Sequence, residues 1–477
     1  FTSRVIPFGT AIADKAKLVF KINVGAAVLG LGYIVGLKYA VIICAGSALV
    51  WFVLIPALPF LSENFLHILN PIYQGGGLAD LPPERIFTDF ARHIGIGGIA
   101  MAGIIGIVKS WDIIKGAVGL AGKEIKGKNK AVNETVIRTQ RDLPMKIIVI
   151  GVILALIATF LFFYFGVVHN LLHAIVGILV VAVIAFLFTT VAANAIAIVG
   201  TNPVSGMTLM TLILASVIMV AVGLKGTAGM VAALVIGGVV CTALSMAGGF
   251  ITDLKIGYWL GSTPAKQQSW KFLGTLVSAA TVGGVIIVLN KTYGFTGEGA
   301  LVAPQANAMA AVIEPLMSGT GAPWFLYAFG AGIALLLTFS KIPALAFALG
   351  MFIPLELNLP LLVGGGISWF VSTRSKNQAL NTARKDKGTL LASGFIAGGA
   401  LMGVVSALIK FIQTTMVEKK IAALGDAANP AIINNIKESH SFFLTTWESS
   451  AGAQWLAIVM YAALIVYFAW DAMRAKT

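Results

Sequence analysis

The chain has 477 residues, of which 58% are hydrophobic and 11% are charged, and its formal net charge at pH 7 is +14. Soluble domains have about 45 to 50% apolar and about 25% charged residues, so the composition excludes a soluble protein and predicts a polytopic membrane protein. The basic residues gather in short loops beside apolar runs, which is the positive-inside pattern and argues against nucleic acid as a partner.

A transmembrane helix needs about 20 mostly apolar residues, and the sequence offers about 11 to 13 transmembrane or re-entrant helices on that measure. We therefore predict an all-α polytopic membrane protein. Four parts follow along the chain: residues 1–145 hold the remainder of an N-terminal repeat and a basic cytoplasmic loop, 146–412 a C-terminal repeat, 413–453 an extracytoplasmic segment, and 454–477 a final transmembrane helix with a cytoplasmic tail.

The loops that are richest in Lys and Arg are expected in the cytoplasm, on the inner side of the plasma membrane. They are Lys109 to Lys146, Asp253 to Lys271, Arg374 to Lys387 and the tail with Arg474 and Lys476. This assignment places the C-terminus in the cytoplasm.

An internal repeat is visible when the chain is shifted by 318 positions, without a gap. The shift superposes Gly32 on Gly350, Leu37 on Leu355, Gly46 on Gly364, and Trp51-Phe52-Val53 on Trp369-Phe370-Val371. The loop after the first copy is acid-rich and the loop after the second is basic, so the copies are expected to face opposite sides of the membrane. Such an inverted repeat is a common plan of secondary transporters. Because the second copy extends further back than the first, we expect additional N-terminal spans before Phe1.

A polar break, Thr201 to Gly206, interrupts the long apolar run from Leu171 to Ile251. Non-helical backbone at membrane depth needs protein or a water-filled cavity to satisfy its polar groups. Asn202, Ser205 and Thr208 are therefore candidate substrate-binding residues, and an ordinary turn between two spans is the alternative.

Further candidates are polar residues next to or inside apolar runs. Tyr258 and Gln305 are candidate substrate-binding residues. Carboxylates in a low-dielectric site favour the protonated form, which suits proton coupling, and the candidates for that role are Asp253, Glu314 and Glu356. For each Glu, an exposed loop carboxylate is the alternative, and for Asp253 the alternative is a solvated pair with Lys255 at the membrane face.

Arg92 and His93 open a Gly-rich span, where they either bind an anionic group or anchor the membrane interface by snorkelling, and the second role is favoured. The sequence shows no metal-ligand spacing, phosphate loop or nucleophile constellation, so no cofactor and no metal site are expected.

Four segments together resemble the prokaryotic branch of the oligopeptide transporter family, and they occur in family order. They are Asn202 to Thr208, Asp253 to Pro264, Ala303 to Ala306 and Leu391 to Gly403. The resemblance implies proton-coupled uptake of small peptides or, as in the related yellow stripe-like members, of metal chelates. The sequence departs from the family pattern at two places, and both bear on substrate specificity. They are Ile251-Thr252, before the Asp-Leu-Lys motif, and Arg92-His93, where Arg-Tyr is usual.

The expected function is secondary active symport of small peptides or peptide-like metal chelates with protons across the cytoplasmic membrane. A channel or a carrier for another small polar solute is the first alternative, and a membrane-embedded enzyme the second. The expected partners are membrane lipid, a peptide or chelate substrate, and protons. The sequence leaves open whether the protein forms a homo-oligomer.

Overall fold

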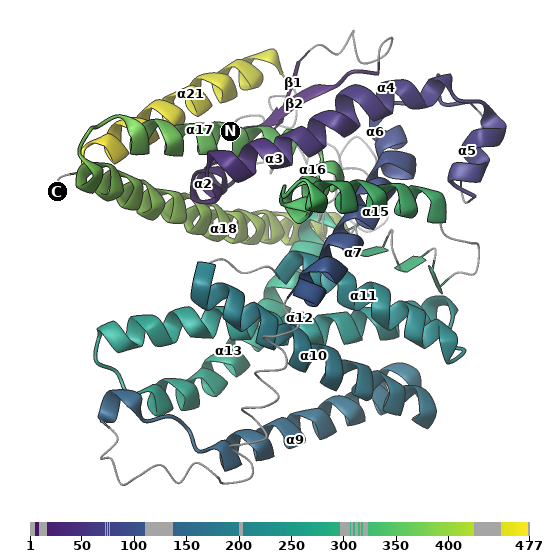
Figure 1. Ribbon diagram of the computed structural model, residues 1–477, viewed down its shortest axis with the longest axis vertical. Coiled ribbons are helices and arrows are strands. Elements are labelled where there is room, and N and C mark those ends of the chain that lie inside the picture. Colours follow the sequence, from purple (N-terminus) through teal and green to yellow (C-terminus); the bar gives the residue numbers. More distant parts are fainter. Residues whose placement is uncertain are drawn as a thin grey trace.

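The protein was analysed as a computed structural model, which describes residues 5–8, 17–71, 73, 75, 77–109, 137–199, 204–295, 323–423 and 450–475, together with single residues between 306 and 317. The architecture is helical, and the expected all-α polytopic membrane protein is confirmed (Figure 1). Within the described ranges, 8 helices are long and apolar enough to cross a membrane. They are Leu37–Phe60, Arg138–Val168, Leu171–Thr190, Gly226–Trp259, Pro264–Tyr293, Leu355–Thr373, Gln378–Ala423 and Ala451–Met473.

A β-hairpin near the start of the chain is an addition that the sequence analysis did not predict. Strand β1 (Val5–Phe8) pairs antiparallel with β2 (Phe20–Asn23), so that Val5 lies opposite Asn23. Strand β2 packs against α17 (Leu355–Thr373). The hairpin therefore lies against α17.

The first helical unit is broken at a glycine. Helix α2 (Ala26–Val35) ends at Gly36, and α3 (Leu37–Ala48) begins directly after it. Gly36 has φ +81°, a left-handed conformation that costs glycine nothing. The chain continues through the π-helical segment η1 (Leu49–Leu54), α4 (Ile55–Ala57) and the 3-10 turn η2 (Leu58–Phe60).

A loop region with short helices follows and leads into the next long helix. Its elements are α5 (Glu63–Leu69), α6 (Pro83–Ile86) and the π-helical segment η3 (Phe87–Ala91), and the long helix is α7 (Arg92–Lys109).

A similar broken unit recurs late in the chain, where α16 (Ala344–Phe352) ends and α17 begins after Pro354. The buried side chain of Asn358 donates hydrogen bonds to the carbonyl oxygens of Gly350, at 3.2 Å, and Ile353, at 3.0 Å. These carbonyls have no helical partner past the break, and an unpaired buried carbonyl is costly. Asn358 thus stabilises the interruption.

The two broken units pack directly on each other, α2 against α17 and α3 against both α16 and α17. Their backbones approach very closely at four glycines. A Cβ added to any of the four would overlap the backbone of the partner helix. The pairs are Gly32 with Leu361, Gly350 with Ile43, Gly46 with Phe347, and Gly364 with Leu29. Small residues at such crossings let membrane helices come into backbone contact.

The remaining helices of this half surround the broken units. Helix α15 (Trp324–Phe339) packs on α7, α7 packs on α16, and α18 (Gln378–Ala423) packs on α2. The last helix, α21 (Ala451–Met473), lies on α17 and α18. Elements from the beginning and the end of the chain therefore share one half of the molecule in Figure 1.

The middle of the chain forms a second bundle with its own buried cluster, which includes Phe188, Met219 and Ile236. Its elements are η4 (Arg138–Gln140), α9 (Met145–Phe163), η5 (Tyr164–Val168), α10 (Leu171–Val199), α11 (Val204–Ala221), α12 (Gly226–Trp259) and α13 (Pro264–Tyr293). No residue of α13 is buried, although it is apolar enough to span a membrane. Such a helix presents its apolar sides to lipid.

Candidate functional site

A chemically diverse hollow in the described part of the chain is a cavity of about 220 Å³ between the β-hairpin and the starts of α7 and α17. We call it the charged cavity, because it contains two cationic and two acidic side chains. Its lining residues are Val19, Lys21, Trp51, Glu84, Phe87, Thr88, Arg92, Pro354, Leu355 and Glu356.

Each charged side chain belongs to a different secondary-structure element. Lys21 lies in β2, Glu84 in the first turn of α6, Arg92 at the first residue of α7 and Glu356 in the first turn of α17. Helix N-termini stabilise nearby carboxylates through their unsatisfied N–H groups. The two acidic residues therefore occupy favourable positions at the starts of their helices.

An ion pair forms one wall of the charged cavity. The Nζ of Lys21 lies 2.6 Å from Oε1 of Glu84 and links the hairpin to α6. Burial raises the pKa of Glu84, but the hydrogen bond and the charge of Lys21 outweigh it, so the pKa is lower than usual. The hairpin has a second attachment, because Nζ of Lys17 donates to the carbonyl oxygen of Leu81 at 2.8 Å.

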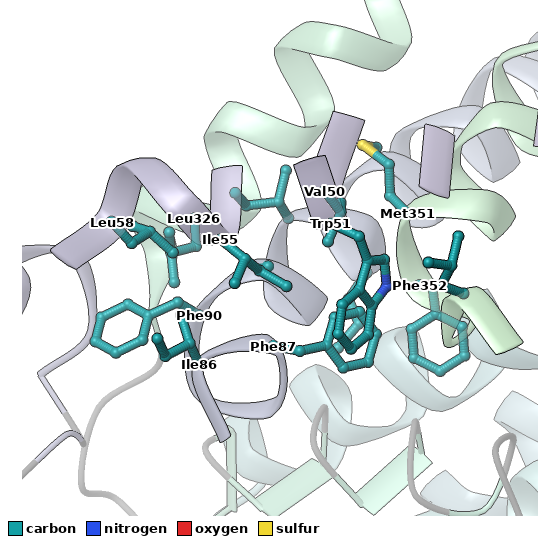
Figure 2. Packing of buried hydrophobic residues seen from close by; sticks show 14 of the residues in the cluster. Val50, Trp51, Ile55, Leu58, Ile86, Phe87, Phe90, Leu326, Met351 and Phe352 are labelled. Atoms are coloured by element: carbon teal, nitrogen blue, oxygen red, sulfur yellow. The ribbon is translucent and has the colours of Figure 1, made fainter. Parts of the chain in front are cut away.

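Aromatic residues form the apolar part of the cavity. The ring of Trp51 stacks on Phe87 with centroids 4.9 Å apart, within the buried cluster drawn in Figure 2. The guanidinium of Arg92 lies 4.8 Å from the ring centre of Phe352, a cation-π distance. Arg92 is thus held by stacking while it lines the charged cavity.

Trp51 also carries an unusual polar group. Its indole nitrogen is buried and has no hydrogen-bond partner among the described residues. A buried donor without an acceptor is costly. Apolar packing alone does not require an N–H group at this position.

Of the acidic residues singled out from the sequence, Glu356 lines the charged cavity. Glu314 is exposed on a short helical stretch and is not among the lining residues. Arg92, for which membrane anchoring was favoured, lies in the charged cavity with Glu356. The structure therefore brings Glu356, a predicted proton-coupling residue, together with Arg92, whose anion-binding role was the less favoured alternative.

Asp253 and Tyr258 lie elsewhere, near the C-terminal end of α12. Asp253 Oδ2 is 2.5 Å from Nζ of Lys271 on α13, and Tyr258 is 62% exposed. Asp253 and Lys271 line an open surface hollow of about 370 Å³. The other lining residues are Phe250, Ile256, Gln267, Trp270 and Gly274. The contact between Asp253 and Lys271 links α12 to α13.

Ser205 and Thr208 lie in the first turns of α11, so part of the polar break is helical. Asn202 and Gln305 lie outside the described residues, as do the side chains of Ser205 and Thr208. No group of three or more His, Cys, Asp or Glu that is able to hold a metal ion occurs among the described residues.

Sequence reasoning missed Lys21, Glu84 and Trp51 as members of a site. The acid-rich loop after the first repeat unit contained Glu84, but nothing in its local pattern distinguished this residue from its acidic neighbours. Lys21 carried no signal at all, because its role depends on a hairpin that was not predicted.

The chain is similar in sequence to known proteins over most of its length. The chain matches a family model described as OPT oligopeptide transporter protein over residues 3–410. It is 26% identical to a protein of Haemophilus influenzae that is provisionally named an oligopeptide transporter, over 516 aligned positions that cover 98% of this chain and 76% of that relative.

Proposed function

Because this chain belongs to the oligopeptide transporter family, we propose that it is a proton-coupled symporter of small peptides and that the charged cavity is its substrate site. It is a multi-pass membrane protein of a transporter family. Peptide-like metal chelates are the second proposed substrate class. Their organic part carries carboxylate and amino groups like those of a peptide, and the groups that are not bound to the metal would face the charged cavity.

The observation that carries the proposal is the gathering of Lys21, Glu84, Arg92 and Glu356 around one cavity beside the break in front of α17. Glu356 lies in the candidate span Leu355–Thr373, and an ionisable residue inside a transmembrane segment is costly and is functional by default. Broken helices in transporters place substrate and ion sites at their ends. A peptide has charged termini and polar amides, and a cavity with both signs of charge suits it.

Glu356 is our candidate for the proton site. A proton carrier has to titrate near the working pH, and the lowered pKa of Glu84 keeps that side chain ionised and paired. Glu356 lines the same cavity at the start of a helix that follows a break. Protonation of Glu356 would remove one negative charge from the space that a peptide carboxylate has to enter, so proton and peptide would favour each other's binding.

An inverted repeat is the proposed frame for alternating access. The glycine contacts between the two broken units support it, because the same shift of 318 residues converts each contact into another. It converts Gly32 with Leu361 into Gly350 with Ile43, and Gly46 with Phe347 into Gly364 with Leu29. The shift also carries Gly36, at the first break, onto Pro354, at the second.

We further propose that the charged cavity opens toward the outside of the plasma membrane and that the C-terminus is cytoplasmic. The basic stretch from Arg374 to Lys387 follows α17, and positive loops favour the cytoplasmic side. The start of α17 then lies outside. A membrane-impermeant thiol reagent applied to cells should label Ser62→Cys and spare Ser375→Cys in a background without the native cysteines, and the reverse pattern would refute this orientation.

Uptake into proteoliposomes tests the transport proposal. We expect dipeptide accumulation that follows an imposed pH gradient, inside alkaline. Glu356→Gln should abolish accumulation but keep peptide exchange between the two sides, because exchange needs no net proton movement. Glu418→Gln, on an exposed part of α18, is the matched control and should behave like the parent.

Accumulation that ignores the pH gradient would remove proton coupling. If Asp253→Asn or Glu314→Gln, rather than Glu356→Gln, separated exchange from accumulation, the proton site would move to that residue. Passive flux of many small solutes would favour a channel.

A further inference from the structure

We propose that the turn between α12 and α13, together with the first part of α13, binds an anionic phospholipid. The headgroup would lie at the turn and an acyl chain would lie along the helix. This face belongs to the second bundle and is separate from the charged cavity. The inference does not depend on which solute the protein transports.

The turn carries more cations than carboxylates. Residues 138–146 and 253–271 hold six cations against two carboxylates, a balance of +4. Both carboxylates are engaged, because Asp253 contacts Lys271 at 2.5 Å and Asp142 accepts a hydrogen bond from Gln268 at 3.1 Å. Within the described ranges, the remaining cations form no ion pair, and they are Arg138, Arg141, Lys146, Lys255 and Lys266. An anionic headgroup would meet these charges.

Hydrogen bonds hold the basic stretch before α9 against the turn. Nη2 of Arg138 donates to the carbonyl oxygen of Gly261 at 2.8 Å, and the amide of Ala265 donates to the carbonyl oxygen of Arg141 at 2.9 Å. Cations from two distant parts of the chain therefore lie side by side before a lipid arrives. A binding site that is already ordered spares the ligand the entropic cost of ordering it. The positive-inside pattern accounts for the charges but does not require this fixed arrangement.

Exposed aromatic side chains place the turn at a membrane interface. Tyr258, Trp259 and Trp270 are 62%, 70% and 69% exposed, so they are not covered by the rest of the described protein. Tyr and Trp are enriched at the level of the lipid headgroups. The Nζ of Lys255 lies 5.5 Å from the ring centres of both Tyr258 and Trp259. These cation-π contacts hold a cation at headgroup level.

An apolar groove starts at this interface and follows α13. The groove is a surface hollow of about 490 Å³ that shares Trp270 and Gly274 with the hollow at Asp253 and Lys271. Its lining residues are Trp270, Leu273, Gly274, Val277, Ser278, Thr281 and Val282. They recur at intervals of three and four and form one face of the helix. The two connected hollows therefore offer a polar end and an apolar extension, which is the chemistry of a phospholipid.

The length of the groove favours an acyl chain over a second transmembrane helix. From Trp270 to Val282 it extends about 18 Å along the helix axis, close to the roughly 15 Å of one leaflet in a hydrocarbon core of about 30 Å. Further along, α13 packs on α18, where the hydroxyl of Thr292 donates to the carbonyl oxygen of Ala407 at 3.5 Å. A partner helix would need the whole length of α13, whereas a lipid chain needs only one leaflet.

Native mass spectrometry of the full chain in detergent tests the proposal by measuring the affinity for added lipids. The probes are phosphatidylglycerol and phosphatidylcholine with the same two oleoyl chains. We expect phosphatidylglycerol to bind at least about fivefold more tightly, since each basic residue near an anionic surface contributes about that factor. Equal affinities would refute the selection of an anionic headgroup. Glycerol phosphate, which has no chains, should not displace the lipid at equal concentration, and displacement would refute the role of the groove.

Variants locate the site on the molecule. Lys255→Gln and Lys266→Gln should each weaken phosphatidylglycerol binding about fivefold. Lys291→Gln, an exposed cation near the other end of α13, is the control and should bind like the parent. Gly274→Leu should weaken the binding of both lipids, because the new side chain occupies the point where the two hollows meet. Gly284→Leu is its control, because a Cβ at either glycine meets no atom within 4 Å and Gly284 does not line the groove.

The outcomes are separable from those of the transport proposal, because lipid affinity is measured without a transported solute. If the unmodified protein prefers phosphatidylglycerol and Lys255→Gln, Lys266→Gln and Gly274→Leu all bind it like the parent, the lipid binds elsewhere and this site is refuted. The comparison of the two lipids in the unmodified protein needs no variant, so a variant that does not fold leaves that test intact.

Discussion

Gly364 lies at the crossing of the two broken units, and replacing it with alanine should destabilise the protein. A Cβ at this position would lie 2.8 Å from the backbone nitrogen of Tyr33 and closer still to the carbonyl oxygen of Leu29. Ordinary carbon contacts begin near 3.4 Å, so even the Tyr33 contact is short by about 0.6 Å. The neighbouring atoms are backbone, and no side-chain rotation relieves the overlap.

The cost follows from the shift that α2 and α17 would have to make. Overpacking of a close-packed interface typically costs about 1 to 3 kcal/mol. Gly366 provides the matched control, because a Cβ there meets no atom within 4 Å. Both substitutions change glycine to alanine in the same helix, so the difference in helix propensity largely cancels. We expect Gly364→Ala to be less stable than Gly366→Ala by about 1 to 3 kcal/mol.

Thermal unfolding in detergent, followed by tryptophan fluorescence, measures the two variants side by side. Gly364→Ala should unfold at a clearly lower temperature than the parent, and Gly366→Ala should unfold at or slightly above the parent temperature. Equal stability of the two variants would refute the close backbone packing of α2 against α17. A comparable loss in Gly46→Ala, whose Cβ would overlap Phe347, would extend the reasoning to the other copy of the contact.

Further predictions concern single interactions. Asp471→Asn removes the carboxylate that accepts a hydrogen bond from Lys387 at 3.0 Å, so α21 should become more sensitive to limited proteolysis, with a loss of about 1 kcal/mol; unchanged cleavage would argue against the pair. Trp51→Phe removes a buried donor without a partner and should change stability by less than about 1 kcal/mol, whereas Trp51→Ala should cost about 3 to 5 kcal/mol. The pKa of Glu84 is lower in the folded protein than in the unfolded chain. Its ion pair with Lys21 therefore stabilises the fold above the ordinary carboxyl pKa, and this stabilisation is lost as the pH falls through the pKa of the folded protein. Glu84→Gln should therefore flatten the stability profile in that acidic range, and an unchanged profile would contradict the assignment.

Much of the architecture was predictable because it is recorded locally along the chain. Apolar runs of the right length predicted the membrane helices, since a span has to satisfy its own backbone groups in lipid. The repeat analysis also identified the glycines at which the broken units touch. Glu356 was identified as a candidate because it is a carboxylate next to an apolar run.

Pairings between distant residues were not predictable in the same way. Lys21 and Glu84 are 63 residues apart, and their contact depends on a hairpin whose strands are too short to give a clear alternation. Asp253 is a candidate for proton coupling, and only the structure shows that Lys271 on the next helix lies 2.5 Å from its carboxylate. The sequence contains both residues and gives no measure of the distance between them.

The sequence by itself determined the class of the protein and its resemblance to the family, because hydropathy and short motifs are recorded locally along the chain. Only the tertiary structure decided that Arg92, first interpreted as a membrane anchor, shares a cavity with Glu356, Glu84 and Lys21. Four charges from separate elements meet only after the helices have packed. The physical reason is that the local pattern fixes the conformation of each segment, whereas the electrostatics of a site depend on distances across the fold.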